Sequence, residues 1–170
     1  MLTKIEIERY FNDEKSESMW FILLGITAII LALLFLFYFK TSLLKGLAIP
    51  FLLVGILQFS TGLVVYNRSD NDRKRNVYAF DMNPDQLQTK ELPRMRIVSK
   101  NFIIYRYIEI ALLIIGAGML FYFKKNPENR LLVGIGLALV IEAAIALSAD
   151  FLAEKRAGNY TRQLEEFIKK

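Results

Sequence analysis

The sequence predicts an all-α, polytopic membrane protein: a four-helix transmembrane bundle made of two tandem hairpins with the same orientation, with cytoplasmic amphipathic helices at both termini. Four stretches of about 20 mostly apolar residues are each long enough to cross roughly 30 Å of hydrocarbon. Charged residues gather between these stretches, although 54% of the 170 residues are apolar. This block pattern excludes an ordinary soluble globule, whose apolar residues are spread more evenly.

Residues 1–18 form the predicted cytoplasmic N-terminal helix. Thr3 precedes Glu6 in the spacing of a capping box, and Leu2 and Ile7 are placed to staple it. We expect a short helix from about residue 4 to 12 that lies on the membrane surface.

Residues 19–66 form the predicted first transmembrane hairpin. The span 19–39 carries no charge at all, and the span 46–66 is interrupted by few polar residues, among them Gln58. The turn between them is too short to fold on its own.

Residues 67–101 are predicted as a cytoplasmic loop with a helical extension, and residues 102–153 as the second transmembrane hairpin. Asn83-Pro84 is typical of a turn, and Pro93 suits the first turn of a helix. The third helix is therefore expected to protrude into the cytoplasm before it crosses as span 102–123. The fourth span covers 131–153.

Residues 154–170 form the predicted cytoplasmic C-terminal helix. Apolar side chains recur there at i, i+4, i+7 and i+8, which is typical of an amphipathic helix; they are Tyr160, Leu164, Phe167 and Ile168. Gly158-Asn159 is expected to separate this helix from the fourth span.

The distribution of Lys and Arg predicts the orientation. The two tails and the 67–101 loop hold sixteen of the 22 Lys and Arg residues, whereas the two short turns hold five. Positive flanks stay on the cytoplasmic side, so both termini should be cytoplasmic in a bacterial-type inner membrane. Nucleic acid is an unlikely partner, because acids are interleaved with the basic run at 73–75.

The two hairpins look like an internal duplication. The sequence FYFK at 37–40 recurs at 121–124, and the same shift places Gln58 on Glu142. Two spans per repeat give both hairpins the same orientation, so the expected symmetry is a pseudo-two-fold axis along the membrane normal.

Glu142 is the strongest candidate for a functional residue inside the membrane. It lies about 16 Å below the outer end of its helix, near the midplane, and Gln58 lies at a similar depth. An ionisable group there costs at least about 2.5 kcal/mol and is a functional hypothesis by default. Three interpretations stay open: a protonated Glu142 bonded to Gln58, a contact with a ligand, partner or subunit, and ion or proton translocation.

A stripe of small residues around Glu142 predicts close helix packing, so Glu142 should face protein and not lipid. The stripe recurs every four residues and consists of Gly134, Ala138, Glu142 itself, Ala146 and Asp150. Gly116 in the third span is expected to pack closely in the same way.

Arg106 and Glu109 are the polar candidates on the third span. They are three residues apart on one helix and can pair. Asp150 lies near the cytoplasmic interface and could also reach Arg106. An interfacial ion pair that anchors the helix is the favoured interpretation.

Enzymatic chemistry has little support in this sequence. The absence of Cys and His excludes thiol nucleophiles, Ser–His pairs and the usual zinc sites. Glu142 and Asp150 are about 12 Å apart along the helix, too far to act as a catalytic dyad. We therefore predict no catalytic residue, no metal site and no cofactor.

Two functions remain. One is a non-catalytic membrane protein that acts through protein–protein contacts; in length and four-span layout the chain resembles the inner-membrane immunity proteins that neutralise pore-forming toxins. The other is a homo-oligomeric ion channel or membrane-permeabilising effector, with Gln58 and Glu142 as a selectivity or gating ring. The expected partners are the lipid bilayer and either another protein or further copies of the chain.

Overall fold

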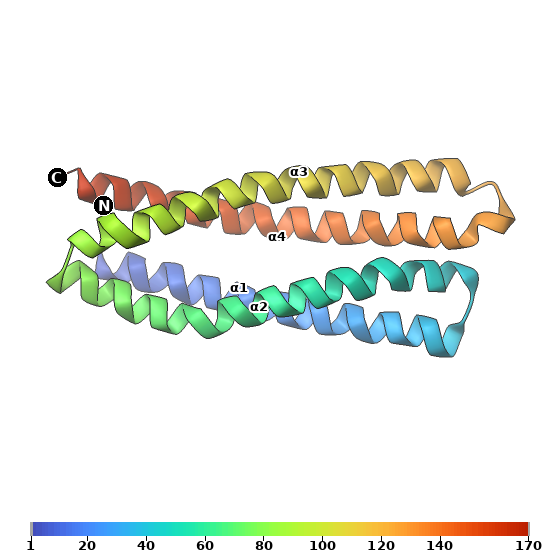
Figure 1. The fold of residues 1–170 in the computed structure, drawn as a ribbon, viewed down its shortest axis with the longest axis horizontal. Coiled ribbons are helices and arrows are strands. Elements are labelled where there is room, and N and C mark those ends of the chain that lie inside the picture. The colour runs from blue at the N-terminus through green and yellow to red at the C-terminus, as the bar shows by residue number, and fades with distance from the viewer. Residues whose placement is uncertain (1, 170) are drawn as a thin grey trace.

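The computed structural model describes residues 2–169 and contains four long helices (Figure 1). Helix α1 covers Lys4–Leu34 and continues as the wider turn η1, Phe35–Phe39; α2 covers Ser42–Met82. The wide turn η2, Leu87–Glu91, leads into α3, Leu92–Phe123, and the short η3, Pro127–Asn129, leads into α4, Arg130–Ile168. No strand occurs in the described part of the chain, so the all-α prediction is confirmed.

All four helical segments are long and apolar enough to cross a membrane, as predicted. They are 36 to 42 residues long, which corresponds to about 54–63 Å, roughly twice the hydrocarbon thickness. Each helix therefore has two parts. We call the bundle of the predicted spans 19–39, 46–66, 102–123 and 131–153 the apolar half, and the remaining helical residues the polar half.

The helices in the polar half are direct continuations of the spans, which corrects the predicted helix end near residue 12 and the predicted break at Gly158-Asn159. The N-terminal helix does not end near residue 12, because residues 13–18 contain neither Gly nor Pro and α1 runs on without a break. Gly158 and Asn159 lie inside α4 and do not separate two helices. Most of the predicted 67–101 loop is helical, with its turn at Asn83-Pro84 as expected.

Local capping explains where the helices begin and end. The Thr3 hydroxyl accepts a hydrogen bond from the Glu6 amide, which confirms the predicted cap of α1. Lys40 adopts a left-handed conformation with φ 52°, and its amide donates to the Phe35 carbonyl. Thr41 then caps α2 by accepting from the Leu44 amide, so two residues suffice to reverse the chain.

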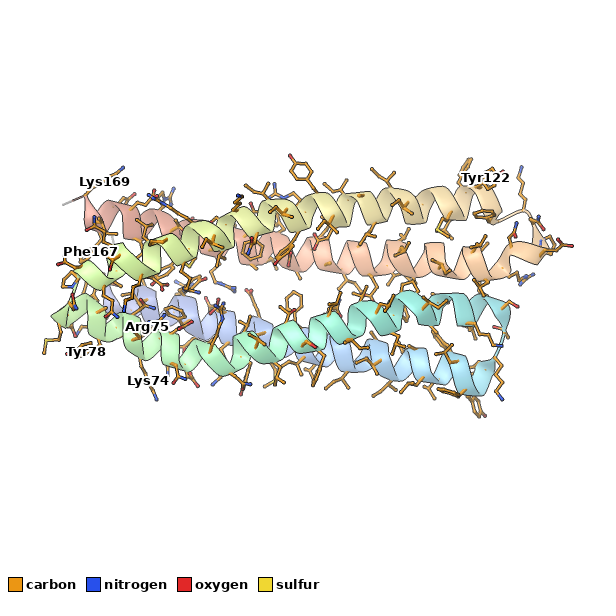
Figure 2. The ribbon with its side chains drawn as sticks, viewed as in Figure 1. Lys74, Arg75, Tyr78, Tyr122, Phe167 and Lys169 are labelled. Carbon is orange, nitrogen blue, oxygen red and sulfur yellow. The ribbon has the colours of Figure 1, made fainter. Side chains whose placement is uncertain are left out.

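The helices pack as two hairpins, α1 with α2 and α3 with α4. The α3–α4 hairpin lies above the α1–α2 hairpin in Figure 1, and α2 and α4 form the main contact between them. Both termini lie at the same end of the bundle as the α2–α3 turn (Figure 1). The labelled residues Lys74, Arg75 and Lys169 lie toward that end in Figure 2, whereas Tyr122 lies at the opposite end.

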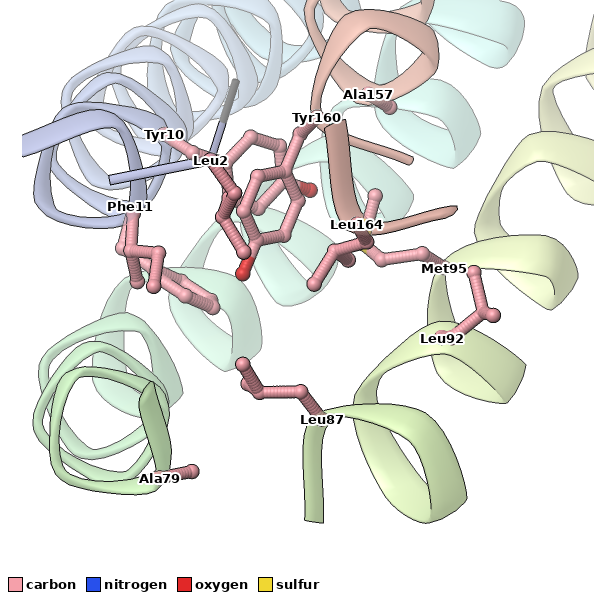
Figure 3. Packing of buried hydrophobic residues seen from close by; sticks show 11 residues of the cluster. Leu2, Tyr10, Phe11, Ala79, Leu87, Leu92, Met95, Ala157, Tyr160 and Leu164 are labelled. Carbon is pink, nitrogen blue, oxygen red and sulfur yellow. The ribbon is translucent and has the colours of Figure 1, made fainter. Parts of the chain in front are cut away.

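The polar half has a packed core of its own, to which all four helices contribute (Figure 3). The Tyr10 and Tyr160 rings stack with centroids 4.2 Å apart, and Phe11 packs edge-on against both. Ile7, Tyr10 and Phe11 are buried in this core. The prediction that the N-terminal helix lies on the membrane surface is therefore wrong: these side chains are covered by α4 and its neighbours.

Candidate functional site

Gln58 on α2 and Glu142 on α4 form a hydrogen bond in the interior of the apolar half. The Gln58 Nε2 atom donates to the Glu142 Oε2 atom at 3.1 Å. The two residues are 8% and 7% exposed. They are equivalent positions of the proposed repeat, 84 residues apart, and a direct contact between equivalent positions is expected beside a two-fold axis. The predicted pairing of these two side chains is present.

The backbones of α2 and α4 are in close contact on the side of this pair that faces the α1–α2 turn, which is the predicted outer side. A Cβ atom added to Gly134 would lie 2.1 Å from the Leu43 carbonyl oxygen, and one added to Gly46 would lie 2.1 Å from the Leu131 carbonyl oxygen. Ala138 is fully buried between the two glycines and Glu142. The outer part of the predicted small-residue stripe thus serves helix packing, as expected.

The inner part of the stripe turns away from α2. Each step of four residues rotates an α-helix by about 40°, so Asp150 lies about 160° around α4 from Gly134. Ala146 and Asp150 are accordingly only half-buried. The Asp150 carboxyl lies beside that of Glu109 on α3 instead.

The sequence suggests that Arg106 pairs with Glu109 or with Asp150. In the structure Arg106 pairs with Glu154 instead. Glu154 lies one helical turn beyond Asp150 on the same face of α4. Glu154 is not among the predicted partners because it lies one residue beyond the predicted span 131–153, although α4 continues past that limit.

A small cavity of about 100 Å³ accompanies these charged groups between α3 and α4. It combines apolar with ionisable side chains and is lined by Phe102, Arg106, Glu109, Leu147, Asp150, Phe151 and Glu154. Within residues 2–169 no group of three or more Asp or Glu side chains is arranged to hold a metal ion. The arrangement anchors charged groups at the boundary of the two halves of the bundle.

Gly116 has the packing role predicted for it. A Cβ atom at Gly116 would come within 2.7 Å of the Gly136 carbonyl oxygen on α4. Its neighbour Gly118 faces open space, so only one glycine of the Gly116-Ala117-Gly118 segment is required by packing.

Several buried polar residues in the polar half were not singled out from the sequence. Glu91 is almost fully buried and binds Arg94 through two hydrogen bonds of 2.6 and 3.0 Å. Burial alone would lower the pKa of Arg94, but the hydrogen bonds and charge of Glu91 raise it, so the guanidinium stays charged. The Glu14 carboxylate accepts from Arg68 and Ser69. The i, i+3 spacing of Glu91 and Arg94 is visible in the sequence. Both residues fall in the predicted 67–101 loop, however, where buried side chains are not expected.

No protein-family model matches this chain, and no curated protein or solved structure is significantly similar to it. The function is therefore argued from the geometry of the residues.

Proposed function

We propose that this chain is a non-catalytic four-span membrane protein, with both termini in the cytoplasm, that acts through contacts with another protein. An immunity-type protein that neutralises a membrane-active toxin is the form of this function that its layout fits best. The observation that carries the proposal is the Gln58–Glu142 hydrogen bond within a single copy of the chain.

This bond uses the polar groups that a channel would need at mid-depth. A selectivity or gating ring requires side chains that face water. Glu142 is buried against α2, and the tight contact between Gly46 and Gly134 lies on the outer side of it. Neither cavity described between residues 2 and 169 is lined by Gln58 or Glu142. The pair therefore fits a structural role better than a permeation path.

The surface of the polar half supports a protein partner. Exposed large apolar side chains in a region outside the spans are typical of interaction sites when they gather on one surface. Tyr78 and Met82 lie one helical turn apart on α2, and they are 63% and 71% exposed. Ile5 on α1 is 73% exposed. Its neighbour Lys4 pairs with Asp81 on α2 at 2.7 Å, so Ile5 lies close to the same surface.

An ion-flux measurement tests the channel alternative. The purified chain is reconstituted in liposomes, and flux is compared for wild type, Glu142→Gln and the control Glu128→Gln in the exposed turn before α4. We expect no flux above that of empty liposomes for any of the three. Flux through the wild type that Glu142→Gln alters and Glu128→Gln does not would overturn the proposal in favour of a homo-oligomeric channel.

A binding measurement tests the partner. If a toxin is encoded beside the gene, the chain should co-purify with it and protect cells that express it. Tyr78→Ala combined with Met82→Ala should reduce both effects, whereas Tyr122→Ala, which removes an exposed aromatic ring at the opposite end, should leave them unchanged. Equal losses in the two variants would contradict the proposed surface.

A further inference from the structure

A groove of about 430 Å³ lies between α1 and α4 in the polar half and reaches the apolar half at Leu152. Neither the Gln58–Glu142 pair nor the exposed surface around Tyr78 contributes to it. Ionisable side chains dominate its lining, which consists of Glu6, Arg9, Tyr10, Asp13, Leu152, Lys155, Arg156, Asn159, Tyr160, Arg162 and Gln163.

The groove carries positive charge that its own acids do not neutralise. Arg9 and Asp13 pair with each other at 4.0 Å, and Arg156 pairs with Glu17. Glu6 accepts a long hydrogen bond of 3.5 Å from Gln163. Lys155 and Arg162 have no ion-pair partner among residues 2–169 and supply the positive charge available to a ligand.

The floor of the groove adds hydrogen-bond donors on a rigid support. The stacked rings of Tyr10 and Tyr160 line it, and the Arg156 guanidinium lies over Tyr10 with its carbon 5.7 Å from the ring centroid. Arg156 lines the groove with its side chain 17% exposed, so a bound anion can accept from its accessible part as well as from the two unpaired cations.

The membrane end of the groove lies at the depth of the headgroup layer of a bilayer. Arg162 lies about 13 Å beyond residue 153 along α4, from where its side chain leans back toward the N-terminus of the helix and so toward the membrane. Leu152 belongs to the last turn of the predicted span, and Lys155 lies about 3 Å beyond residue 153 along α4. Headgroups extend roughly 5–8 Å beyond the hydrocarbon on each side. Leu152 is 62% exposed there and can meet acyl chains.

We propose that this groove binds the headgroup of an anionic phospholipid, with the phosphate held by Lys155, Arg156 and Arg162 and the acyl chains against Leu152. The inference rests on the proposed membrane position of the apolar half but not on the proposed protein partner. Basic pockets beside membrane helices on the cytoplasmic side recognise such lipids. A phosphate attached to acyl chains fits a groove that offers two unpaired cations and is apolar at its membrane end.

A lipid-binding experiment tests this assignment. The purified full chain in a neutral detergent is titrated with short-chain phosphatidylglycerol, and the rise in its thermal unfolding midpoint is recorded. Parallel titrations use short-chain phosphatidylcholine and inorganic phosphate. The test variant is Lys155→Gln/Arg162→Gln, and the control is Lys100→Gln/Lys74→Gln. The control removes the same charge at similar distances from the predicted spans but outside the groove.

We expect phosphatidylglycerol to stabilise the wild type and the control, while phosphatidylcholine and phosphate do not. The test variant should bind phosphatidylglycerol about thirtyfold more weakly, with an unchanged midpoint in the absence of lipid. Equal losses in both variants would overturn the site, because they would indicate diffuse attraction. Equal stabilisation by phosphatidylcholine, stabilisation by phosphate alone, or no response to phosphatidylglycerol would overturn the lipid assignment, the last leaving an acidic protein segment as the occupant.

Discussion

The buried hydroxyl of Tyr160 makes the folding stability of the polar half depend on pH. Its ring stacks on Tyr10, and its hydroxyl is buried without a hydrogen-bond partner. Burial raises the pKa of both tyrosines above the usual value, so the folded state favours the neutral phenols. Their contribution to stability is complete below the unfolded pKa of about 10 and is lost as the pH rises beyond it.

We therefore predict that Tyr160→Phe is neutral or stabilising by about 1 kcal/mol at pH 7, because it removes an unsatisfied polar atom and keeps the stacked ring. Above pH 10 the wild type should lose stability more steeply than the variant. Thermal unfolding between pH 7 and 11, followed by circular dichroism, measures both effects. The exposed Tyr122→Phe serves as the control, and a destabilised Tyr160→Phe at pH 7 would contradict the prediction.

The part of the candidate site that has only one possible pairing was predictable from the sequence. Gln58 and Glu142 share a depth and a repeat position, and a buried amide and carboxyl at one level have few other partners. Arg106 had several acids within reach, and spacing alone could not choose Glu154 over Glu109 or Asp150. That choice depends on how α4 rotates against α3, which apolar periodicity does not report.

The helices themselves were predictable as spans but not in their full length. Gly158 costs about 1 kcal/mol inside a helix, yet α4 continues because Tyr160 and Leu164 are buried beyond it. Along α1, the core-facing residues Glu14 and Ser18 are polar although they are buried, so a search for apolar residues does not find this side of the helix. Residues 13–18 therefore show no apolar stripe, and tertiary packing decides that α1 continues through them.

The contact between α2 and α4 yields a prediction at the scale of these elements. Gly134→Ala places a Cβ atom against the Leu43 carbonyl, which should push the helices apart and cost about 1–3 kcal/mol. Gly118→Ala meets open space and should be neutral or slightly stabilising, because alanine favours the helix. Unfolding titrations with sodium dodecyl sulfate compare the two. Equal effects would show that the backbone contact contributes nothing specific.

The whole molecule holds its two hairpins together at both ends by different means. In the apolar half α2 meets α4 through glycines, small residues and the Gln58–Glu142 bond. In the polar half α1 also meets α4, through the stacked tyrosines and the Arg156–Glu17 pair. Because the hairpins run in the same direction, the α1–α2 turn and the α3–α4 turn must lie on the same side of any membrane that the bundle crosses.

That requirement can be tested directly, because the chain has no cysteine to remove first. Single cysteines are introduced as Lys45→Cys and Glu128→Cys at the two short connections and as Asp85→Cys at the α2–α3 turn, all exposed positions. From the Lys and Arg bias we expect a membrane-impermeant maleimide to label the first two in intact spheroplasts and Asp85→Cys only after permeabilisation. Labelling of Lys45→Cys and Glu128→Cys from opposite sides would contradict the paired hairpins. Labelling of Asp85→Cys alone in intact cells would keep the fold but reverse the orientation, and with it the leaflet in which the groove between α1 and α4 meets lipid.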